Sequence, residues 1–132
     1  KTLVALNEIQ LHNKKPTKAL RFNVYVDKKC VFETVVGDGV VISTPYGSGA
    51  YYKSTGGKPF CKGIGIALNN PHNHRHALVV DESSTVEVEL LREEAQLFSD
   101  NNEKNMISLS PKDRIIIKKH IKSARFITGF RQ

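Results

Sequence analysis

The chain has 132 residues, which suits one domain that removes roughly two-thirds of its unfolded surface from water and argues against two. Its formal charge of +7 and pI of about 9.5 favour anionic partners such as nucleotides, nucleic acid or phosphorylated metabolites. No run approaches the roughly 20 apolar residues of a membrane span. Cys30 and Cys61 are the two cysteines and form no CxxC pair, which argues against a secreted disulfide scaffold. We therefore expect a cytoplasmic protein.

The first third of the chain predicts β-strands. Residues 2–6 form a β-like run that leads directly into Asn7 and Glu8. Residues 19–27 alternate apolar and polar side chains and predict a half-buried strand. A turn joins this strand to residues 30–36, which completes a hairpin.

The next stretch, from residue 37, is the densest in unusual chemistry and reads GDGVVISTPYGSGAYYKSTGGK. Residues 40–42 predict a short buried strand, Ser43 or Thr44 can cap a helix with Pro45 at its first position, and residues 50–53 can fill one or two turns. Such a strand, turn and short helix presents free backbone N–H groups and small hydroxyls, which suit a nucleotide or a phosphate. The segment lacks the Walker Gly-Lys-Ser/Thr, and a tight connection in an ordinary domain is the alternative interpretation.

The remainder of the chain also reads as short strands. The predicted runs are residues 64–68, 77–80, 85–91, 95–98, 106–109, 115–119 and 125–128. Turn clusters separate them, and a helical pattern is almost absent. This spacing predicts an all-β fold, a β-sandwich of short antiparallel strands with one short helix after the Thr-Pro segment.

Two polar clusters invite a catalytic or metal-binding interpretation. His72, His74 and His76 would share one face of an extended segment and could gather around zinc, but no fourth ligand has a fixed place nearby. Glu87 and Glu89 alternate with apolar residues, so we expect them on the wet face of a strand rather than as a catalytic pair. A structural role is the simpler expectation for both clusters.

The basic residues do not form a recognisable nucleic-acid site. They are spread over the chain, and no aromatic motif interleaves them as in an RNA-recognition sheet. We therefore expect mostly solubilising roles, and a nucleic-acid-binding β domain remains only as an alternative.

The segment STPYGSGAYYKSTGG, preceded by Gly-Asp-Gly, resembles the signature of the NAD kinases (ATP-NAD kinase family). In that family a Gly-Asp-Gly turn leads into Thr-Pro-Thr-Gly-Ser-Thr-Ala-Tyr, and an Asn-Glu or Asn-Asp pair precedes both, as Asn7 and Glu8 do here. The resemblance covers residues 7–113 and concerns the C-terminal half of the enzyme. It implies that residues 1–132 are the NAD-binding C-terminal β-sandwich domain. The family's N-terminal α/β domain, whose Gly-Gly-Asp-Gly motif carries the aspartate taken as the general base, is absent from this sequence, which we interpret as cut from a longer protein.

The resemblance implies an NAD site and assigns its residues. The implied substrate-binding residues are Asn7, Glu8, Asp38, Tyr46, Gly49, Ala50, Tyr51 and Ser54. Asn7 would hydrogen-bond the adenine and Glu8 a ribose hydroxyl, while Tyr51 would line the pocket and can stack on a flat base. Asp38 and Ser54 would hold the nicotinamide end. The resemblance places no catalytic residue and no metal ligand in this sequence.

The sequence departs from the family pattern at three places. Tyr46 stands where the family usually has Thr or Ser, and Gly49 stands where it usually has Thr, so two hydroxyl contacts on the adenine side are lost or moved. Asp100 and Asn101 replace a later Asp-Gly pair, which bears on the turn because Gly adopts positive φ more readily than Asn.

The resemblance also implies an activity for the complete protein. The 2′-hydroxyl of the adenosine ribose of NAD would attack the γ-phosphate of ATP to give NADP, with Mg²⁺ offsetting phosphate charge. We expect no turnover by this fragment alone, and we expect a homo-oligomer, dimer or tetramer, in which Asp38 reaches a neighbouring subunit's site. The alternatives are a non-catalytic dinucleotide- or nucleotide-binding module and, from the broader superfamily, a lipid or sugar kinase.

Overall fold

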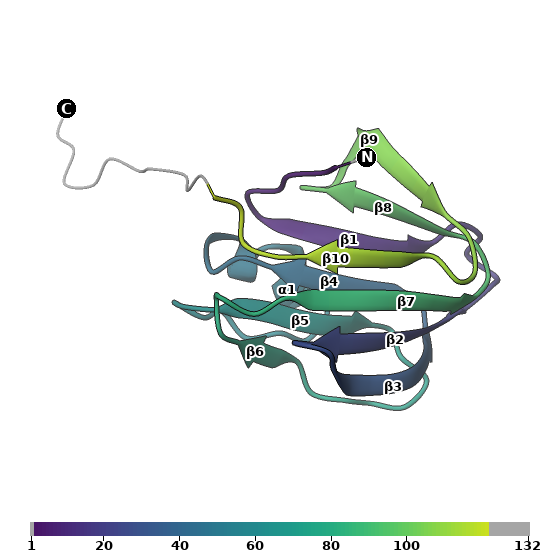
Figure 1. Ribbon diagram of the computed structural model, residues 1–132, viewed down its shortest axis with the longest axis horizontal. Helices are drawn as coiled ribbons and strands as arrows, with labels where there is room; N and C mark the ends of the chain where they lie inside the picture. Colours follow the sequence, from purple (N-terminus) through teal and green to yellow (C-terminus); the bar gives the residue numbers. More distant parts are fainter. Residues whose placement is uncertain (1, 122–132) are drawn as a thin grey trace, which may run out of the picture.

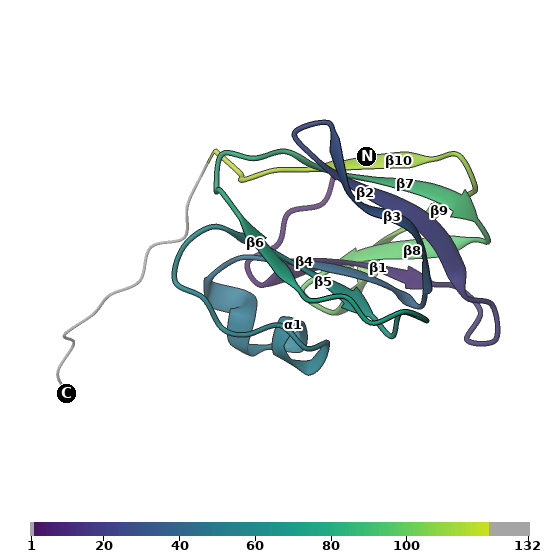
Figure 2. The ribbon, with the colours of Figure 1, turned by 90° about the horizontal axis from the view of Figure 1, so that it is seen from below.

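The computed structural model describes residues 2–121, which form two antiparallel sheets packed face to face (Figures 1 and 2). The strands are β1 (Glu8–Asn13), β2 (Leu20–Val26), β3 (Lys29–Gly37), β4 (Gly39–Ser43), β5 (Ile64–Asn69), β6 (Leu78–Val80), β7 (Val86–Arg92), β8 (Ala95–Ser99), β9 (Asn102–Leu109) and β10 (Arg114–Ile117). A 3₁₀ turn, η1 (Tyr46–Gly49), and a short helix, α1 (Tyr51–Ser54), follow β4. One sheet has the order β6-β5-β4-β1-β8-β9, and the other has the order β10-β7-β2-β3. The predicted all-β sandwich is confirmed.

The core lies between the two sheets because each strand turns alternate apolar side chains inward. Phe22 and Val24 of β2 are fully buried and meet the inward side chains of the six-stranded sheet in one hydrophobic cluster. In that sheet Ile9 of β1 pairs with Ile42 of β4, and Leu11 pairs with Val40. Side chains opposite one another in a ladder share a face, so the residues between these pairs point to the outer face.

The structure differs from the sequence expectation at the start of the chain. Residues 2–6 are not a strand, and the first strand is β1, which begins at Glu8. The pair Asn7-Glu8 therefore opens a strand instead of following one. β-Propensity in residues 2–6 did not decide the outcome, because β1 pairs with β4 and β8 through the register of Ile9 and Leu11.

The later strands agree with the expectation in number and order, with one longer than expected. β9 begins at Asn102 and not at residue 106, since only Asp100 and Asn101 separate it from β8. Both residues have positive φ, 51° and 55°, as a two-residue hairpin turn requires. The predicted run at 125–128 lies outside the described residues.

The outer face of the six-stranded sheet carries η1 and α1. Figure 2 shows α1 on the side of this sheet that faces away from the four-stranded sheet. Tyr52 of α1, Val41 of β4 and Ala67 of β5 form a second, smaller buried cluster there. The predicted strand, turn and short helix after residue 37 are thus confirmed, and this outer face carries the implied site residues of η1 and α1.

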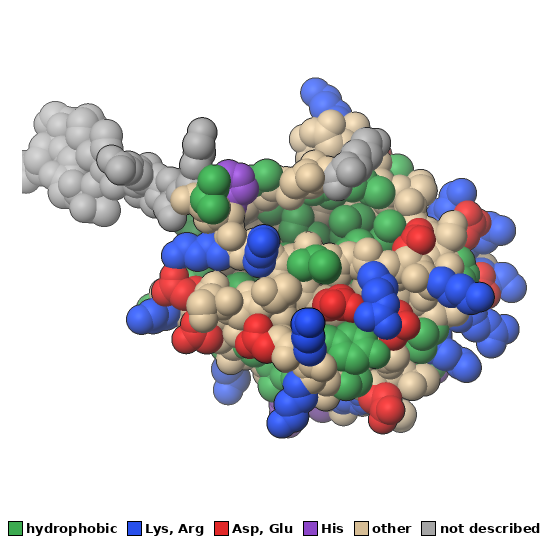
Figure 3. Space-filling model, viewed as in Figure 1, with side chains coloured by type: hydrophobic (Ala, Val, Ile, Leu, Met, Phe, Trp, Pro, Cys, Tyr) green, Lys and Arg blue, Asp and Glu red, His purple; other side chains and the backbone are tan. Residues whose placement is uncertain are grey.

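The surface carries mixed charge. On the face shown in Figure 3, Lys and Arg side chains are spread among Asp and Glu side chains instead of forming one stripe. Neither helical segment in residues 2–121 is long or apolar enough to cross a bilayer.

Candidate functional site

The turn after β4 is built by hydroxyl side chains of the signature segment. The Oγ1 of Thr44 accepts a hydrogen bond from the Gly47 N–H at 3.0 Å, but the N-cap of η1 is Pro45, so the predicted cap by Ser43 or Thr44 with Pro45 as the first helical residue was wrong. Buried Ser48 donates its hydroxyl to the Pro45 carbonyl at 2.7 Å and accepts the Phe60 N–H at 3.1 Å. The Thr44 and Ser48 hydroxyls therefore hold the turn itself.

The pair Asn7-Glu8 is joined to this turn through its backbone. The Asn7 carbonyl accepts the Thr44 N–H at 2.9 Å and lies within 3.3 Å of the Ser43 hydroxyl, which donates to it. Gly47 packs directly on Asn7, because a Cβ built on Gly47 would lie 2.3 Å from the Asn7 carbonyl oxygen and 2.4 Å from its Cα. Only glycine fits at this position. The sequence placed Asn7 and the turn 37 residues apart in one predicted site, and the structure brings them into contact.

On the other side, the carboxylate of Asp100 holds the same pair. It accepts the N–H groups of Leu6 at 2.8 Å, Asn7 at 2.6 Å and Glu8 at 3.2 Å. The Asp100 N–H donates in turn to the Glu8 carbonyl at 3.0 Å. In the sequence, Asp100 stands out only as a departure from the family pattern. Its contact with Asn7 and Glu8 cannot be predicted there, because the residues are more than 90 positions apart.

The backbone of Glu8 is hydrogen-bonded, but one oxygen atom of its side chain has no hydrogen-bond partner in the part of the chain that the structure describes. The residue is 2% exposed, and its Oε1 atom makes no hydrogen bond within residues 2–121. Burial raises the pKa of this carboxyl, and the nearby Asp100 charge raises it further. The adjacent Gln10 is also 2% exposed, and its Nε2 likewise lacks a partner among the described residues. A buried acceptor and a buried donor without partners on one face of β1 lower the free energy of unfolding. This face therefore has hydrogen-bonding groups that a ligand could use.

Asp38 and Tyr51 meet at a different place, the end of β5. The Asp38 carboxylate accepts the side-chain amides of Asn13 at 3.3 Å and Asn70 at 3.1 Å. Its N–H donates to the Asn69 carbonyl at 3.0 Å, while the Asn69 side chain donates to the Tyr51 hydroxyl at 3.2 Å. Asn69 thus links the two predicted site residues, a role that sequence reasoning missed.

The structure does not bring Asp38 beside Glu8. Glu8 pairs with Ser43 at the end of β4, whereas Asp38 precedes the start of that strand. Five residues of extended chain span about 16 Å. The two predicted site residues therefore lie at opposite ends of one strand.

The remaining predicted site residues lie on the exposed surface of the η1 and α1 segment. Gly49, Ala50 and Ser54 are exposed, and the Tyr46 side chain is 60% exposed. A Cβ on Gly49 would meet nothing within 4 Å, so packing does not demand glycine there. The two departures from the family pattern, at Tyr46 and Gly49, therefore change the surface and leave the fold intact.

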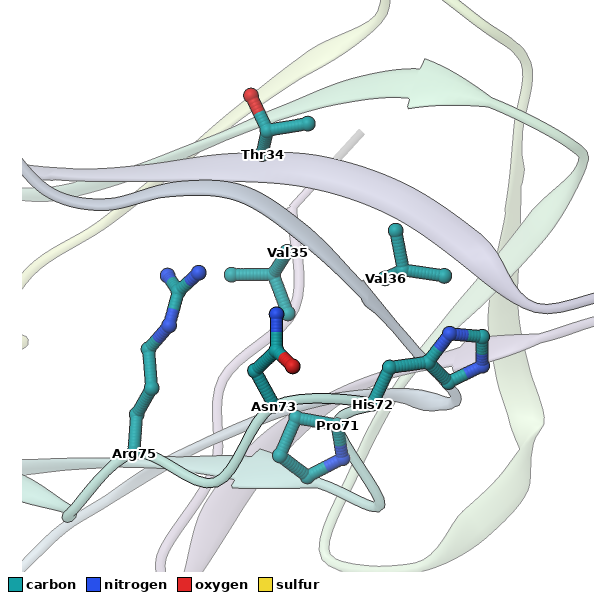
Figure 4. Close-up of a pocket in the computed structure, with 7 residues that line it drawn as sticks. All are labelled: Thr34, Val35, Val36, Pro71, His72, Asn73 and Arg75. Atoms are coloured by element: carbon teal, nitrogen blue, oxygen red, sulfur yellow. The ribbon is translucent and has the colours of Figure 1, made fainter.

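Figure 4 shows a separate pocket of about 270 Å³ between β3 and the loop after β5. Its polar lining residues are tied to β3 by backbone contacts: the His72 N–H donates to the Val36 carbonyl at 2.8 Å, and Arg75 donates to the Glu33 carbonyl at 3.3 Å. These bonds support the structural role expected for the histidine loop. None of the predicted NAD-site residues lines this pocket.

The histidine loop is not extended, so the geometry that the zinc interpretation assumed is not present. The rings of His74 and His76 are 5.0 Å apart and nearly perpendicular, whereas His72 lines the pocket beside β3. Across residues 2–121 no group of three or more His, Cys, Asp or Glu side chains is placed to hold a metal ion. A loop that alternates histidines in sequence does not keep them on one face, because it is not an extended strand.

Taken together, these features define a β-sandwich domain with a polar site on the outer face of one sheet, where a strand start meets a glycine-rich turn. Residues 6–129 match the family model of the ATP-NAD kinase C-terminal domain. The chain therefore belongs to this family.

Individual relatives agree with this assignment. The chain is 34% identical over 129 residues to a bifunctional NADP phosphatase/NAD kinase of Methanococcus maripaludis, covering 95% of this chain and 22% of that protein. It is 33% identical over 120 residues to an NAD kinase of Helicobacter hepaticus, covering 88% and 38%. The chain thus spans well under half the length of these relatives.

Solved structures share the fold. The crystal structure of an NAD kinase from Archaeoglobus fulgidus in complex with ATP superimposes with a TM-score of 0.76 at 26% identity, covering 89% of this chain and 46% of that chain. Yeast NADH kinase complexed with NADH gives a TM-score of 0.74 at 22% identity, covering 95% and 37%. The second likeness shows the fold alone.

Proposed function

We propose that this chain is the dinucleotide-binding part of an NAD kinase and that the complete protein transfers the γ-phosphate of ATP to the 2′-hydroxyl of the adenosine ribose of NAD, which gives NADP. Membership of the ATP-NAD kinase C-terminal domain family supports this. The structural observation that carries it is the unpartnered, buried Oε1 atom of Glu8 on a backbone that is held from both sides. Such an atom costs stability unless a ligand supplies its hydrogen bond.

The proposed contacts follow from the chemistry of these side chains. A ribose hydroxyl that donates to the Glu8 carboxylate would supply the hydrogen bond that the fold leaves out. The Asn7 amide offers a donor and an acceptor, which together suit an adenine edge. Ala50 and Tyr51 would line the pocket, with the exposed Tyr46 and Gly49 on the adenine side.

The nicotinamide end would be held by Asp38 and Ser54, with Asp38 supplied by a neighbouring subunit. The distance along β4 supports this, since Asp38 and Glu8 of one chain lie about 16 Å apart. A homo-oligomer would complete each site from two chains. The +7 charge would attract both anionic substrates, NAD and ATP.

Residues 2–121 do not fit a Mg²⁺ site, because they hold no cluster of acidic ligands. The proposal therefore assigns neither the ion nor the general base to this domain. Mg²⁺ would enter with ATP and offset the charge of its phosphates.

The test has two parts. Isothermal titration of the 132-residue chain with NAD should show binding, while incubation with NAD, ATP and Mg²⁺ should give no NADP. The parent chain should form NADP under the same conditions. NADP formation by the 132-residue chain would overturn the proposal that this part binds NAD without catalysing the reaction. NAD binding without NADP formation by the parent chain would favour a non-catalytic dinucleotide-binding module.

Two variants test the site itself. Asp38→Ala and Tyr51→Ala should weaken NAD binding while the circular dichroism spectrum stays that of the folded domain. Thr34→Ala, in the pocket of Figure 4, is the matched control and should bind NAD as the unaltered chain does. Unchanged NAD affinity in both site variants would reject these two assignments.

A further inference from the structure

We propose that Asp100 is a positioning residue of the dinucleotide site: its carboxylate holds the backbone of Asn7 and Glu8 so that their side chains face the ligand. This inference rests on the proposed function, since it concerns how the same site is kept in shape. Asp100 does not contact the ligand in this proposal and acts only through Asn7 and Glu8.

The geometry is that of an anion bound by consecutive backbone N–H groups. The N–H groups of Leu6, Asn7 and Glu8 all donate to the Asp100 carboxylate, at 2.8, 2.6 and 3.2 Å. Hydrogen bonds to a charged acceptor are stronger than those between neutral groups. Three of them on successive residues fix the backbone where the irregular segment 2–7 becomes β1.

The bonds from the turn complete the restraint. While Asp100 takes the N–H groups, Thr44 and Ser43 donate to the Asn7 carbonyl, and Gly47 lies against the Asn7 backbone. The backbone of Asn7 is therefore held between two turns that come from distant parts of the chain. Preorganisation of this kind favours binding, because a site that is already ordered loses less conformational freedom when the ligand binds.

The choice of residue at position 100 also points to function. Asp100 has a φ of 51°, a conformation that Asn and Gly adopt with equal or greater ease. An aspartate there brings a negative charge next to Glu8, which is one cause of the raised pKa of the Glu8 carboxyl. That repulsion opposes stability, whereas the three charge-assisted bonds serve the position of Asn7 and Glu8.

The hairpin between β2 and β3 provides a matched control. Asp27 also stands in a two-residue turn with positive φ, 49°, and its carboxylate accepts one backbone N–H, from Thr85 at 2.9 Å. It lies in the hairpin of the other sheet, and hydrogen bonds join it to Thr85. Asp27→Gly and Asp100→Gly therefore make the same chemical change in the same type of turn.

The experiment compares NAD binding by the unaltered 132-residue chain, Asp100→Gly, Asp100→Asn and Asp27→Gly. Asp100→Gly should raise the dissociation constant about tenfold or more, with shifted backbone amide NMR signals confined to residues 6–8 and their neighbours. Asp100→Asn keeps an acceptor oxygen and should restore part of the affinity. Asp27→Gly should leave NAD affinity unchanged even if it lowers the unfolding temperature.

The outcomes separate the two proposals. If the unaltered chain does not bind NAD, the proposed function fails. If it binds and folded Asp100→Gly binds equally well, the positioning role is rejected. Equal losses in Asp100→Gly and Asp27→Gly would also reject it, because a purely structural effect would explain both. Carbonyl NMR of the Glu8 side chain adds an independent readout, since the pKa of this carboxyl should fall in Asp100→Asn and not in Asp27→Gly.

Discussion

Two glutamates in the two sheets of this protein have opposite surroundings. Glu89 of β7 accepts hydrogen bonds from the Tyr25 hydroxyl at 2.9 Å, from Asn23 at 3.3 Å and from Arg114 at 3.1 Å. These partners, the Tyr25 hydroxyl first, hold the pKa of the Glu89 carboxyl below its usual range. Glu8 of β1 is buried with an unpartnered oxygen, and its pKa is raised.

The two carboxylates differ in whether the fold supplies their hydrogen bonds. Glu89 has its hydrogen bonds satisfied within the fold, so nothing more is required to explain it. In Glu8, by contrast, the backbone N–H donates to Asp100, while the side-chain Oε1 atom has no hydrogen-bond partner among the described residues. A buried polar atom without a partner costs stability, and binding of a hydroxyl-bearing ligand is the proposal that accounts for it.

The largest effect should come from Gly47→Ala. The added methyl group would overlap the Asn7 backbone, which cannot move aside as a flexible side chain would. We expect the free energy of unfolding to fall by about 1–3 kcal/mol and NAD binding to be lost. Gly49→Ala is the control for stability alone, because a Cβ there meets nothing within 4 Å. Chemical denaturation of both variants measures stability, titration calorimetry measures NAD binding by Gly47→Ala, and an equal loss of stability in the two variants would contradict the described packing.

Glu8→Gln should affect binding and stability in opposite senses. Loss of a hydrogen bond to a charged acceptor should weaken NAD binding by about 1.5–3 kcal/mol. The free energy of unfolding should stay the same or rise, because the variant removes a buried charge. A Glu8→Gln domain that binds NAD normally but unfolds more easily would show that Glu8 is structural, like Glu89.

The pH dependence of stability should carry the same signature. Since the Glu8 pKa in the folded domain is raised above its ordinary value of 4.5, the folded state holds this proton more tightly than the unfolded state. Glu8 therefore disfavours folding more as pH rises from 4.5 to the raised value, and its effect is constant above that. The free energy of unfolding of the native chain relative to Glu8→Gln should fall across this window. A rise in this relative free energy of unfolding would show that the Glu8 pKa is lowered in the folded domain and not raised.

Glu89→Gln should have the smallest effect. Glu89 and Arg114 lie on the surface of the other sheet, where ion pairs contribute little to stability. We expect less than about a twofold change in NAD affinity, since the site is remote, and the stability contributed by the lowered Glu89 pKa should vanish as pH falls through that pKa. A marked loss of NAD affinity in Glu89→Gln would contradict the interpretation that Glu89 is structural and that only Glu8 of the two takes part in NAD binding.

Sequence patterns were enough to predict most of the fold. The alternation in residues 19–27 became β2, and the short helix expected after the Thr-Pro segment is α1. The first strand was wrong because β-propensity in residues 2–6 was outweighed by the pairing of β1 with β4 and β8. The extended geometry assumed for the histidine loop was wrong, because this segment is a loop and not a strand.

The sequence by itself therefore determined the local elements and, through its signature, the family. Turn chemistry and strand periodicity act between residues close in the chain, so they can be read there. Tertiary structure alone decided that Asp100 holds Asn7 and Glu8, that Gly47 packs on Asn7, and that Asp38 lies at the far end of β4. These contacts depend on strand register and on the closure of the sandwich, which join residues 30 to 90 positions apart and leave no local trace.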